Sequence, residues 1–349
     1  MAEMKKLPFK NPWIANYPST SQALSILNNY PELDEWILSR FIQLVCTDDT
    51  KTIDFVDFSL EQCPFLRYTE MKVNIIHEIG ISMLDFVIHA IDQNYYVKAH
   101  IETSKLPIYD FHDRYHDLMI YGYDKKERIF YIADHFKGGY YTSSSCGFEE
   151  LIQSIQYNKD EYFTHRLQLI EFDKSLTKYK ILIQNDHKFL YKLDFHYIIH
   201  LIECYLNSTP LYKENSIFPF MTEYEAKSHK WGIQCYEILL YHVSHLEMYG
   251  STDSFAIQSF YTVLAHKLMM QRRLSLCMER YPKCVNEMMC EKSIEISNRT
   301  KLVLNLFLLL QQKTRDMNRM NRLRSYIISL ADMDRSLMEN IFTTLKTNS

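Results

Sequence analysis

The sequence predicts an α+β fold in two parts: a domain built on an antiparallel sheet, followed by a mostly α-helical domain. Two observations support this prediction. Up to about residue 185 of the 349, segments with helical period alternate with short β-type runs, whereas beyond it nearly every apolar residue recurs at helical spacing. No internal repeat or low-complexity linker divides the chain. We therefore expect domains at residues 1–185 and 186–349.

Three helices are predicted early in the chain from apolar side chains that fall on one face: residues 19–30, 34–46 and 70–92. The first of them has the clearest start. Pro18 biases Tyr17 towards an extended conformation, and Ser19 offers a hydroxyl group for the N-cap.

Strands are predicted next, and two of them form a hairpin. The runs 116–123 and 128–134 are separated by the turn-forming sequence Gly122-Tyr123-Asp124-Lys125. The run 95–101 is a further β-type segment, and 102–113 is a loop containing Pro107. A short helix at 148–157 and strands at 168–172 and 179–183 complete the first domain.

The second domain is predicted to consist of long helices. Their apolar positions recur at a spacing of three and four residues. The predicted ranges are 194–207, 224–249, 252–279, 292–318 and 320–346.

Composition excludes several classes of function. The net charge of −4 creates no field that would recruit nucleic acid. Only seven glycines are present, and no glycine-rich phosphate loop or dinucleotide-binding motif occurs. The apolar run Leu302–Leu310 is far shorter than the roughly 20 residues of a membrane span, and the N-terminus lacks the apolar core of a signal peptide. We expect a soluble, cytoplasmic protein.

The eight cysteines do not form a metal-binding pattern. No CxxC pair occurs, so the spacing predicts neither a zinc site nor another metal site. We interpret Cys46 and Cys63 as packed, reduced thiols. No cofactor is predicted.

The predicted hairpin brings together a histidine and a carboxylate. His116 opens one strand and Asp134 closes the next, and antiparallel pairing places the start of one strand beside the end of its partner. A carboxylate bound to one ring nitrogen fixes the tautomer of the imidazole and leaves the other nitrogen as a base. The alternative is a structural histidine and an aspartate that caps a loop.

A nucleophile that uses such a base belongs at a helix N-terminus, where the dipole and free amides favour an anion. Ser19 occupies this position in the sequence, although an ordinary N-cap serine explains it equally. Asn16, three residues earlier, is a candidate oxyanion donor or a turn residue.

Two other groups remain as alternatives. His112 lies four residues before His116 and could act as the base, or with Asp110 and Asp113 could bind a metal ion. Cys146 precedes a glycine in the serine-rich Ser143–Gly147, which we predict to be a loop, and it is predicted to be the most exposed thiol, which makes it an alternative nucleophile.

These residues resemble a known family. Ser19-Thr20-Ser21-Gln22-Ala23-Leu24 is similar to the Cys-x-Ser-x-Ala-Leu helix of the butirosin biosynthesis protein H N-terminal family. The segment from His116 to Gly122-Tyr123-Asp124 resembles its His-x-x-x-x-x-Gly-Tyr-Asp strand, and Phe130–Asp134 its Asp-terminated strand. Peptidases that remove double-glycine leader peptides have the same layout. The likeness covers roughly residues 8–172, and Trp231-Gly232-Ile233 is weakly similar to the helical region of the family.

The resemblance implies a papain-like fold and a Ser/Cys-His-Asp site made of Ser19, His116 and Asp134, supported by Asn16. It also implies an acyltransferase of secondary-metabolite or antibiotic biosynthesis. Such an enzyme moves an acyl group from a carrier-protein thioester to an amine or water, in pathways for nonribosomal peptides or polyketides. The expected partners are an acyl or peptidyl carrier protein and a small-molecule or peptide acceptor.

The chain departs from the family at the nucleophile, because Ser19 stands where the family has cysteine. Three explanations remain open at this point. In the first, Ser19 is the nucleophile and uses the same His and Asp. In the second, catalysis is lost and the protein is a pseudoenzyme that binds a carrier protein or peptide. In the third, the nucleophile lies elsewhere in the chain. A peptidase-like hydrolase is a further alternative.

Overall fold

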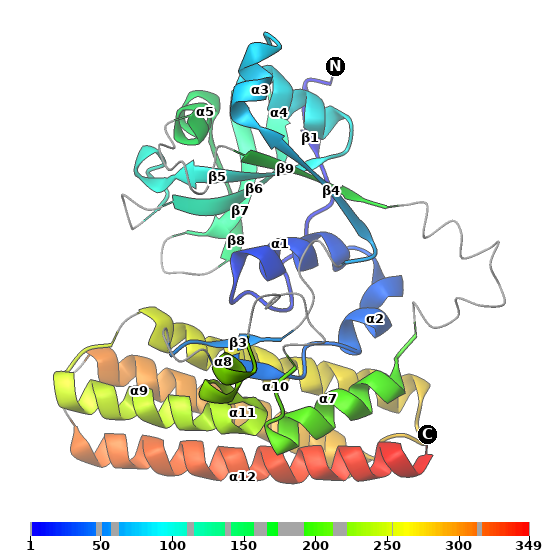
Figure 1. The fold of residues 1–349 in the computed structure, drawn as a ribbon, viewed down its shortest axis with the longest axis vertical. Coiled ribbons are helices and arrows are strands. Elements are labelled where there is room, and N and C mark those ends of the chain that lie inside the picture. The colour runs from blue at the N-terminus through cyan, green and yellow to red at the C-terminus, as the bar shows by residue number, and fades with distance from the viewer. Residues whose placement is uncertain are drawn as a thin grey trace. The chain divides into compact units, whose positions relative to one another are not determined.

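The computed structural model describes residues 2–46, 51–56, 63–109, 115–136, 141–156, 166–173, 192–211, 222–252, 254–312 and 316–348. The fold is mixed α+β, with an antiparallel sheet and many helices (Figure 1). The chain divides into two compact units. The sheet unit contains Met1–Pro31 and Ser59–His187, and the helical unit contains Glu32–Phe58 and Lys188–Ser349.

The division into units differs from the predicted single boundary near residue 185. Glu32–Phe58, which we call the inserted segment, belongs to the helical unit although it lies within the first sixth of the chain. The predicted helix 34–46 is accordingly wrong at its end. Only Asp34–Leu38 (α2) is α-helical, and Leu44–Cys46 (β2) is a strand that pairs with Ile53–Phe55 (β3).

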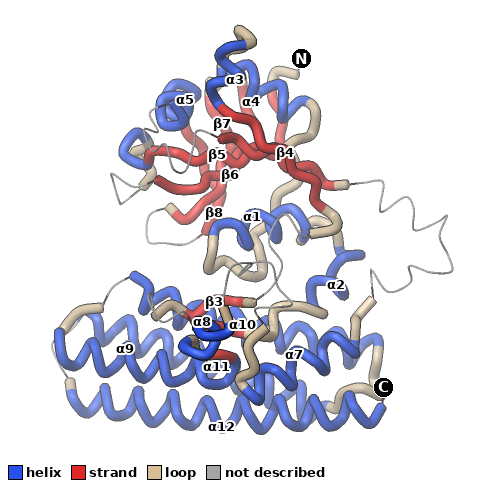
Figure 2. The backbone as a smooth tube through the Cα atoms, viewed as in Figure 1, coloured by secondary structure: helices blue, strands red, loops and turns tan. Residues whose placement is uncertain are grey.

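The sheet unit is built on seven strands of the described chain, all paired antiparallel (red in Figure 2). Six of them follow the order β4-β9-β5-β6-β7-β8, and β1 pairs with β6. The strands are β1 (Met4–Lys6), β4 (Leu66–Lys72), β5 (Tyr96–Glu102), β6 (Tyr115–Asp124), β7 (Ile129–His135), β8 (Tyr141–Gly147) and β9 (Arg166–Phe172).

Helices pack on this sheet. Helix α1 contacts β6 and β7, whereas α4 and α5 both contact β5. Their bounds, with those of α3, are α1 (Pro18–Leu27), α3 (Val73–Glu78), α4 (Met83–Asp92) and α5 (Phe148–Gln156). The predicted helix 70–92 is therefore a strand end followed by two helices. The predicted strand 179–183 lies outside the described residues.

The hairpin of β6 and β7 forms as predicted, and its glycine has a packing reason. A side chain at Gly122 would meet the carbonyl oxygen of Lys5 at 2.6 Å, because β1 pairs with β6 there. Tyr123 donates its hydroxyl to Asp92 at 2.5 Å, and the Asp124 carboxylate accepts from two amides of the turn. The Gly-Tyr-Asp motif thus serves the fold of the hairpin.

The helical unit is dominated by long helices that run side by side (Figure 1). A second sheet of the order β10-β2-β3 pairs the inserted segment with this unit. The predicted helix 224–249 is interrupted between Ser228 and Cys235 by β10 and a 3-10 turn. The elements are α7 (Phe195–Asn207), α8 (Glu223–Ser228), β10 (Lys230–Trp231), α9 (Cys235–Tyr249), α10 (Ser254–Arg280), α11 (Glu287–Gln312) and α12 (Met317–Asn348).

One face of α10 holds the inserted segment through polar side chains spaced seven residues apart, which is about two helical turns. These side chains are Ser259, His266, Arg273 and Arg280. In that order they bind the amide of Ile53 at 3.0 Å, the carbonyl of Ile42 at 2.8 Å, the carbonyl of Leu38 at 2.5 Å and the carboxylate of Glu35 at 2.7 Å. Three backbone groups of the inserted segment are therefore satisfied by side chains of the helix.

A buried ionic cluster lies at the centre of the helical unit. Lys267 Nζ is 2.5 Å from Asp334 Oδ2, and the Tyr205 hydroxyl donates to the same oxygen at 2.6 Å. Lys267 also donates to His266 Nδ1 at 2.9 Å. Burial lowers the pKa of His266 well below its usual value, and the neighbouring Lys267 charge lowers it further, so His266 is neutral and donates from Nε2 to Ile42.

None of the helices among the described residues has both the length and the apolar character needed to cross a membrane.

Candidate functional site

A buried carboxylate at the end of β7 organises the candidate site. Asp134 is inaccessible to solvent, and its Oδ2 accepts hydrogen bonds from His116 Nδ1 at 2.6 Å and from the Tyr109 hydroxyl at 2.5 Å. Its Oδ1 accepts from the amide of His135 at 2.7 Å. Burial alone raises the pKa of Asp134, but the hydrogen bonds from His116 and His135 outweigh this and lower it. Asp134 is therefore an ionised acceptor at neutral pH.

His116 lies where the predicted strand pairing places it, beside Asp134. Because an ionised carboxylate only accepts, the proton must be on Nδ1, and Nε2 is the nitrogen that can accept another proton. Burial lowers the pKa of His116, yet the hydrogen bond and charge of Asp134 more than compensate, and the pKa is raised overall. The side chain is 24% exposed, so solvent reaches the imidazole.

Ser19 is the second residue of helix α1 rather than its N-cap. Tyr17 is the N-cap, with extended backbone at φ −139° and ψ 136°, and Pro18 is the first helical residue. The prediction that Ser19 caps the helix is therefore wrong by two positions. The first helical hydrogen bond runs from Ser21 N to Tyr17 O at 2.9 Å. The amides of Ser19 and Thr20 consequently have no partner within the helix and can serve an anion.

Two hydrogen bonds attach the start of α1 to the strands that carry His116 and Asp134. Gln22 donates its side-chain amide to the carbonyl of Asp117 at 2.9 Å. His135 Nε2 donates to the carbonyl of Ala15 at 2.8 Å. These contacts lie on either side of Ser19 in the sequence, and each ends at a residue adjacent to one member of the His–Asp pair. Among the described residues, however, no hydrogen bond joins the Ser19 hydroxyl to His116.

Asn16 lies in the loop just before α1, between Ala15 and the N-cap, and is half-buried. Its position is compatible with a donor near the helix start. The structure thus brings His116 and Asp134 into contact, and attaches the segment holding Asn16 and Ser19 to the same two strands.

The structure bears on only one of the two alternative groups predicted from the sequence. His112, Asp110 and Asp113 fall within 110–114, outside the described residues. Cys146 is not an exposed loop thiol as predicted: it is buried in β8 opposite Phe130, and burial raises its pKa to about 12. A thiol with that pKa is protonated and unreactive at neutral pH.

Cys46 and Cys63 are both buried, which confirms that they are packed. Within the part of the chain that the structure describes, no group of three His, Cys, Asp or Glu side chains could hold a metal ion.

A second His–Asp contact lies next to the first but is of a different kind. Asp117 accepts from His100 Nδ1 at 3.1 Å and pairs with Lys98 at 2.9 Å. Burial raises the pKa of Asp117, but these two partners lower it to about 2. Because consecutive strand residues point to opposite faces, Asp117 faces away from His116. The ion pair with Lys98 makes this cluster an ion-pair network rather than a histidine held by a carboxylate alone.

Two residues of the site, Tyr109 and His135, are not predicted from the sequence. Tyr109 follows Pro107 in the stretch predicted as a loop, and nothing in its spacing indicates a carboxylate partner. His135 directly follows Asp134, and a histidine beside the predicted orienting residue was the available signal.

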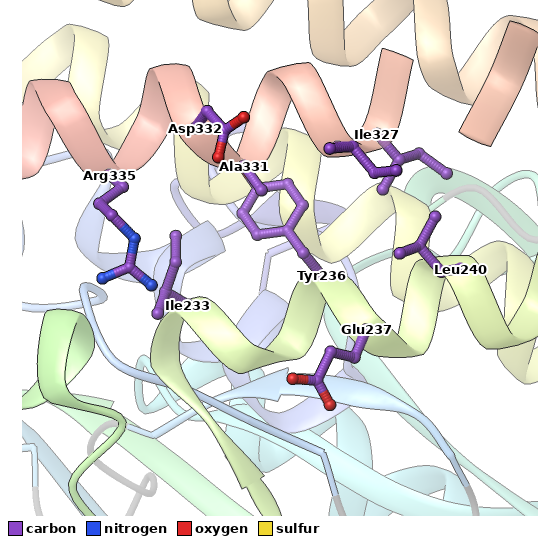
Figure 3. A pocket seen from close by; sticks show the side chains of 9 residues that line it. Ile233, Tyr236, Glu237, Leu240, Ile327, Ala331, Asp332 and Arg335 are labelled. Atoms are coloured by element: carbon purple, nitrogen blue, oxygen red, sulfur yellow. The ribbon is translucent and has the colours of Figure 1, made fainter. Parts of the chain in front are cut away.

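A pocket of about 180 Å³ lies in the helical unit, between α9 and α12 (Figure 3). Apolar side chains and the Tyr236 ring line it, and Glu237, Asp332 and Arg335 add charge. No predicted site residue lines this pocket.

Comparison with known proteins does not identify a family. No protein-family model matches the sequence, and no curated protein matches it.

Proposed function

We propose that this protein is a papain-like acyl-transfer enzyme whose nucleophile is Ser19, with His116 as general base and Asp134 as the residue that orients it. The observation that carries the proposal is the 2.6 Å hydrogen bond between His116 Nδ1 and a fully buried, ionised Asp134. It leaves Nε2 as the proton acceptor on a side chain that solvent reaches.

In the proposed first step, Ser19 Oγ attacks the carbonyl carbon of a thioester while His116 Nε2 takes the hydroxyl proton. A C–O bond forms, and the carbonyl electron pair moves onto oxygen. The amides at Ser19 and Thr20, with the Asn16 side chain, would stabilise this oxyanion. The C–S bond then breaks, and His116 returns its proton to the departing sulfur.

In the second step an acceptor amine attacks the carbonyl carbon of the acyl-serine while His116 Nε2 takes a proton from the amine. A C–N bond forms, the C–O bond to Ser19 breaks, and His116 gives the proton to Ser19 Oγ. The resemblance to the butirosin biosynthesis protein H family supports an acyl or peptidyl carrier protein as the thioester donor, in secondary-metabolite biosynthesis. Water in place of the amine would make the same site a hydrolase, and an amide in place of the thioester would make it a peptidase.

One observation favours a second candidate function, that of a decayed site which binds a carrier protein or peptide. A serine hydroxyl needs its proton removed during attack, and no hydrogen bond in the described part of the chain links Ser19 to His116. The same binding surface could persist without catalysis.

Intact-protein mass spectrometry would separate these functions. The wild-type chain is incubated with an acyl N-acetylcysteamine thioester or a fluorophosphonate, and the adduct is located by peptide mapping. We expect an adduct on Ser19 that disappears in Ser19→Ala and slows by about 10²–10⁴-fold in His116→Ala.

Matched controls are exposed residues of the same unit, Ser145→Ala and His77→Ala, which should label as the wild type does. Labelling of Ser19→Cys without labelling of the wild type would support the decayed site. No adduct in either protein would reject the acyl-transfer proposal. Peptide cleavage without an acceptor amine would favour the peptidase.

A further inference from the structure

Tyr109 shares the carboxylate oxygen that holds His116. Its hydroxyl lies 2.5 Å from Asp134 Oδ2, the atom that also accepts from His116 Nδ1. The phenol is 1% exposed, and its ring centroid is 6.2 Å from that of His116. One oxygen thus receives two donors, and the strength of each depends on the other.

The backbone around Tyr109 fixes the phenol firmly. The 3-10 turn Thr103–Lys105 is capped by the Glu102 side chain, which accepts from Ser104 N at 3.1 Å. The amide of Tyr109 then donates to the carbonyl of Leu106 at 3.2 Å. The ring packs against Phe136 with centroids 5.3 Å apart. The hydroxyl therefore reaches Asp134 from a turn that has its own internal support.

A phenol that donates to a carboxylate withdraws charge from it. The carboxylate then attracts the proton on His116 Nδ1 less strongly, and His116 becomes a weaker base and a better proton donor to a leaving group. The phenol also restrains rotation of the carboxylate. It holds Oδ2 of Asp134, whereas the His135 amide holds Oδ1. Both effects act on His116 through Asp134.

We propose that Tyr109 is a positioning residue of the acyl-transfer site, which holds Asp134 and sets the basicity of His116 without touching the substrate. This inference rests on the proposed function for its meaning in catalysis. The contact itself and its effect on His116 can be measured in the protein without any substrate.

The variants used in a test must leave the other titratable residues close to this cluster unsubstituted, because each of them could also shift the titration of His116. They are Asp117, His135, Tyr141 and Cys146.

The test is the titration of His116 in the full chain, followed by NMR of its ring carbon, in the wild type and in Tyr109→Phe. Loss of the phenol donor concentrates the charge of Asp134 on His116, so the titration should move to higher pH. The rate of Ser19 labelling at neutral pH should fall by about tenfold, because a larger fraction of His116 is then protonated and cannot act as the base. The pH profile of labelling should move to higher pH with the titration.

Tyr123→Phe is the matched control, because Tyr123 is also fully buried and donates to a carboxylate, that of Asp92, at 2.5 Å. It should leave the His116 titration in place. If Tyr109→Phe does not fold, 3,5-difluorotyrosine placed at position 109 gives a stronger donor and should move the titration to lower pH.

An unchanged His116 titration in folded Tyr109→Phe, or a shift of the same sign with the fluorinated residue, would overturn the inference. Absence of any label on wild-type Ser19 would instead reject the proposed function and leave the measured effect of Tyr109 on His116 intact.

Discussion

Two buried carboxylates, one in each unit, are held by similar partners yet differ in what reaches them. Asp134 of the sheet unit pairs with His116, and Asp334 of the helical unit pairs with Lys267. A buried tyrosine hydroxyl donates to each carboxylate as well. The histidine side chain is 24% exposed, whereas the lysine is only 2% exposed.

This difference in exposure separates a site that can exchange protons from one that cannot. Burial lowers the pKa of Lys267, and Asp334 acts against that decrease. Sealed ion pairs of this kind add little net stability over apolar packing, but they are costly to break. A perturbed, buried pair is therefore a functional candidate only when one partner is accessible from solvent, as His116 is.

The largest effect is expected from removal of the buried charge of Lys267. Lys267→Met leaves Asp334 buried without its charge partner, and we expect a loss of about 3–5 kcal/mol in the free energy of unfolding. Urea denaturation followed by circular dichroism measures it.

Lys301→Met on the exposed face of α11 is the control and should change stability by less than about 0.5 kcal/mol. A loss of under 1 kcal/mol in Lys267→Met, on the order of a surface effect, would mean that this pair is not sealed.

The contribution of the His116–Asp134 pair to stability should depend on pH. The pKa of His116 is raised above its usual value of 6.5 in the folded protein. Its contribution to stability is therefore fully present below pH 6.5 and is lost as the pH rises through the folded pKa. The difference in unfolding free energy between the wild type and His116→Gln, measured from pH 5 to 9, should shrink with increasing pH. A difference that grows with pH would contradict the raised pKa.

The smallest effect is expected from thiol reagents, which test whether the cysteines of the two units differ in access. Cys63 and Cys146 of the sheet unit are buried, and Cys284 and Cys290 of the helical unit are half-buried, whereas the other cysteines of the helical unit are buried as well: Cys46, Cys204, Cys235 and Cys277. Mass spectrometry after brief treatment with iodoacetamide should find label on Cys284 and Cys290 first, with no loss of fold. Early modification of Cys146 would return it to the candidate nucleophiles.

Local pattern predicted the hairpin and the meeting of His116 with Asp134, because antiparallel pairing over a short turn leaves little freedom in register. It failed where partners are distant in sequence. Leu44–Cys46 has an apolar pattern that also fits a helix, and its strand form depends on pairing with Lys230–Trp231. The serine-rich Ser143–Gly147 is predicted as a loop but belongs to β8, which pairs along the whole of β7.

For the candidate site too, the sequence predicted the contact within the hairpin and missed the partner outside it. The pair itself follows from the hairpin, but the Tyr109 donor comes from a turn whose course the sequence does not indicate. The Gly-Tyr-Asp motif strengthened the active-site interpretation, yet each of its residues has a structural contact of its own. A motif near a site can therefore mark the scaffold rather than the chemistry.

The hydrogen bonds between α10 and the inserted segment have a consequence for folding during protein synthesis. A ribosome completes residue 58 about 200 residues before the helix that covers it, which is about 10–40 s at roughly 5–20 residues per second. During that interval side chains that are finally buried, such as Leu38 and Ile42, have no covering helix. We expect a nascent chain in this state, and a fragment ending at residue 185, to be prone to aggregation, because their apolar side chains lack the helix that covers them.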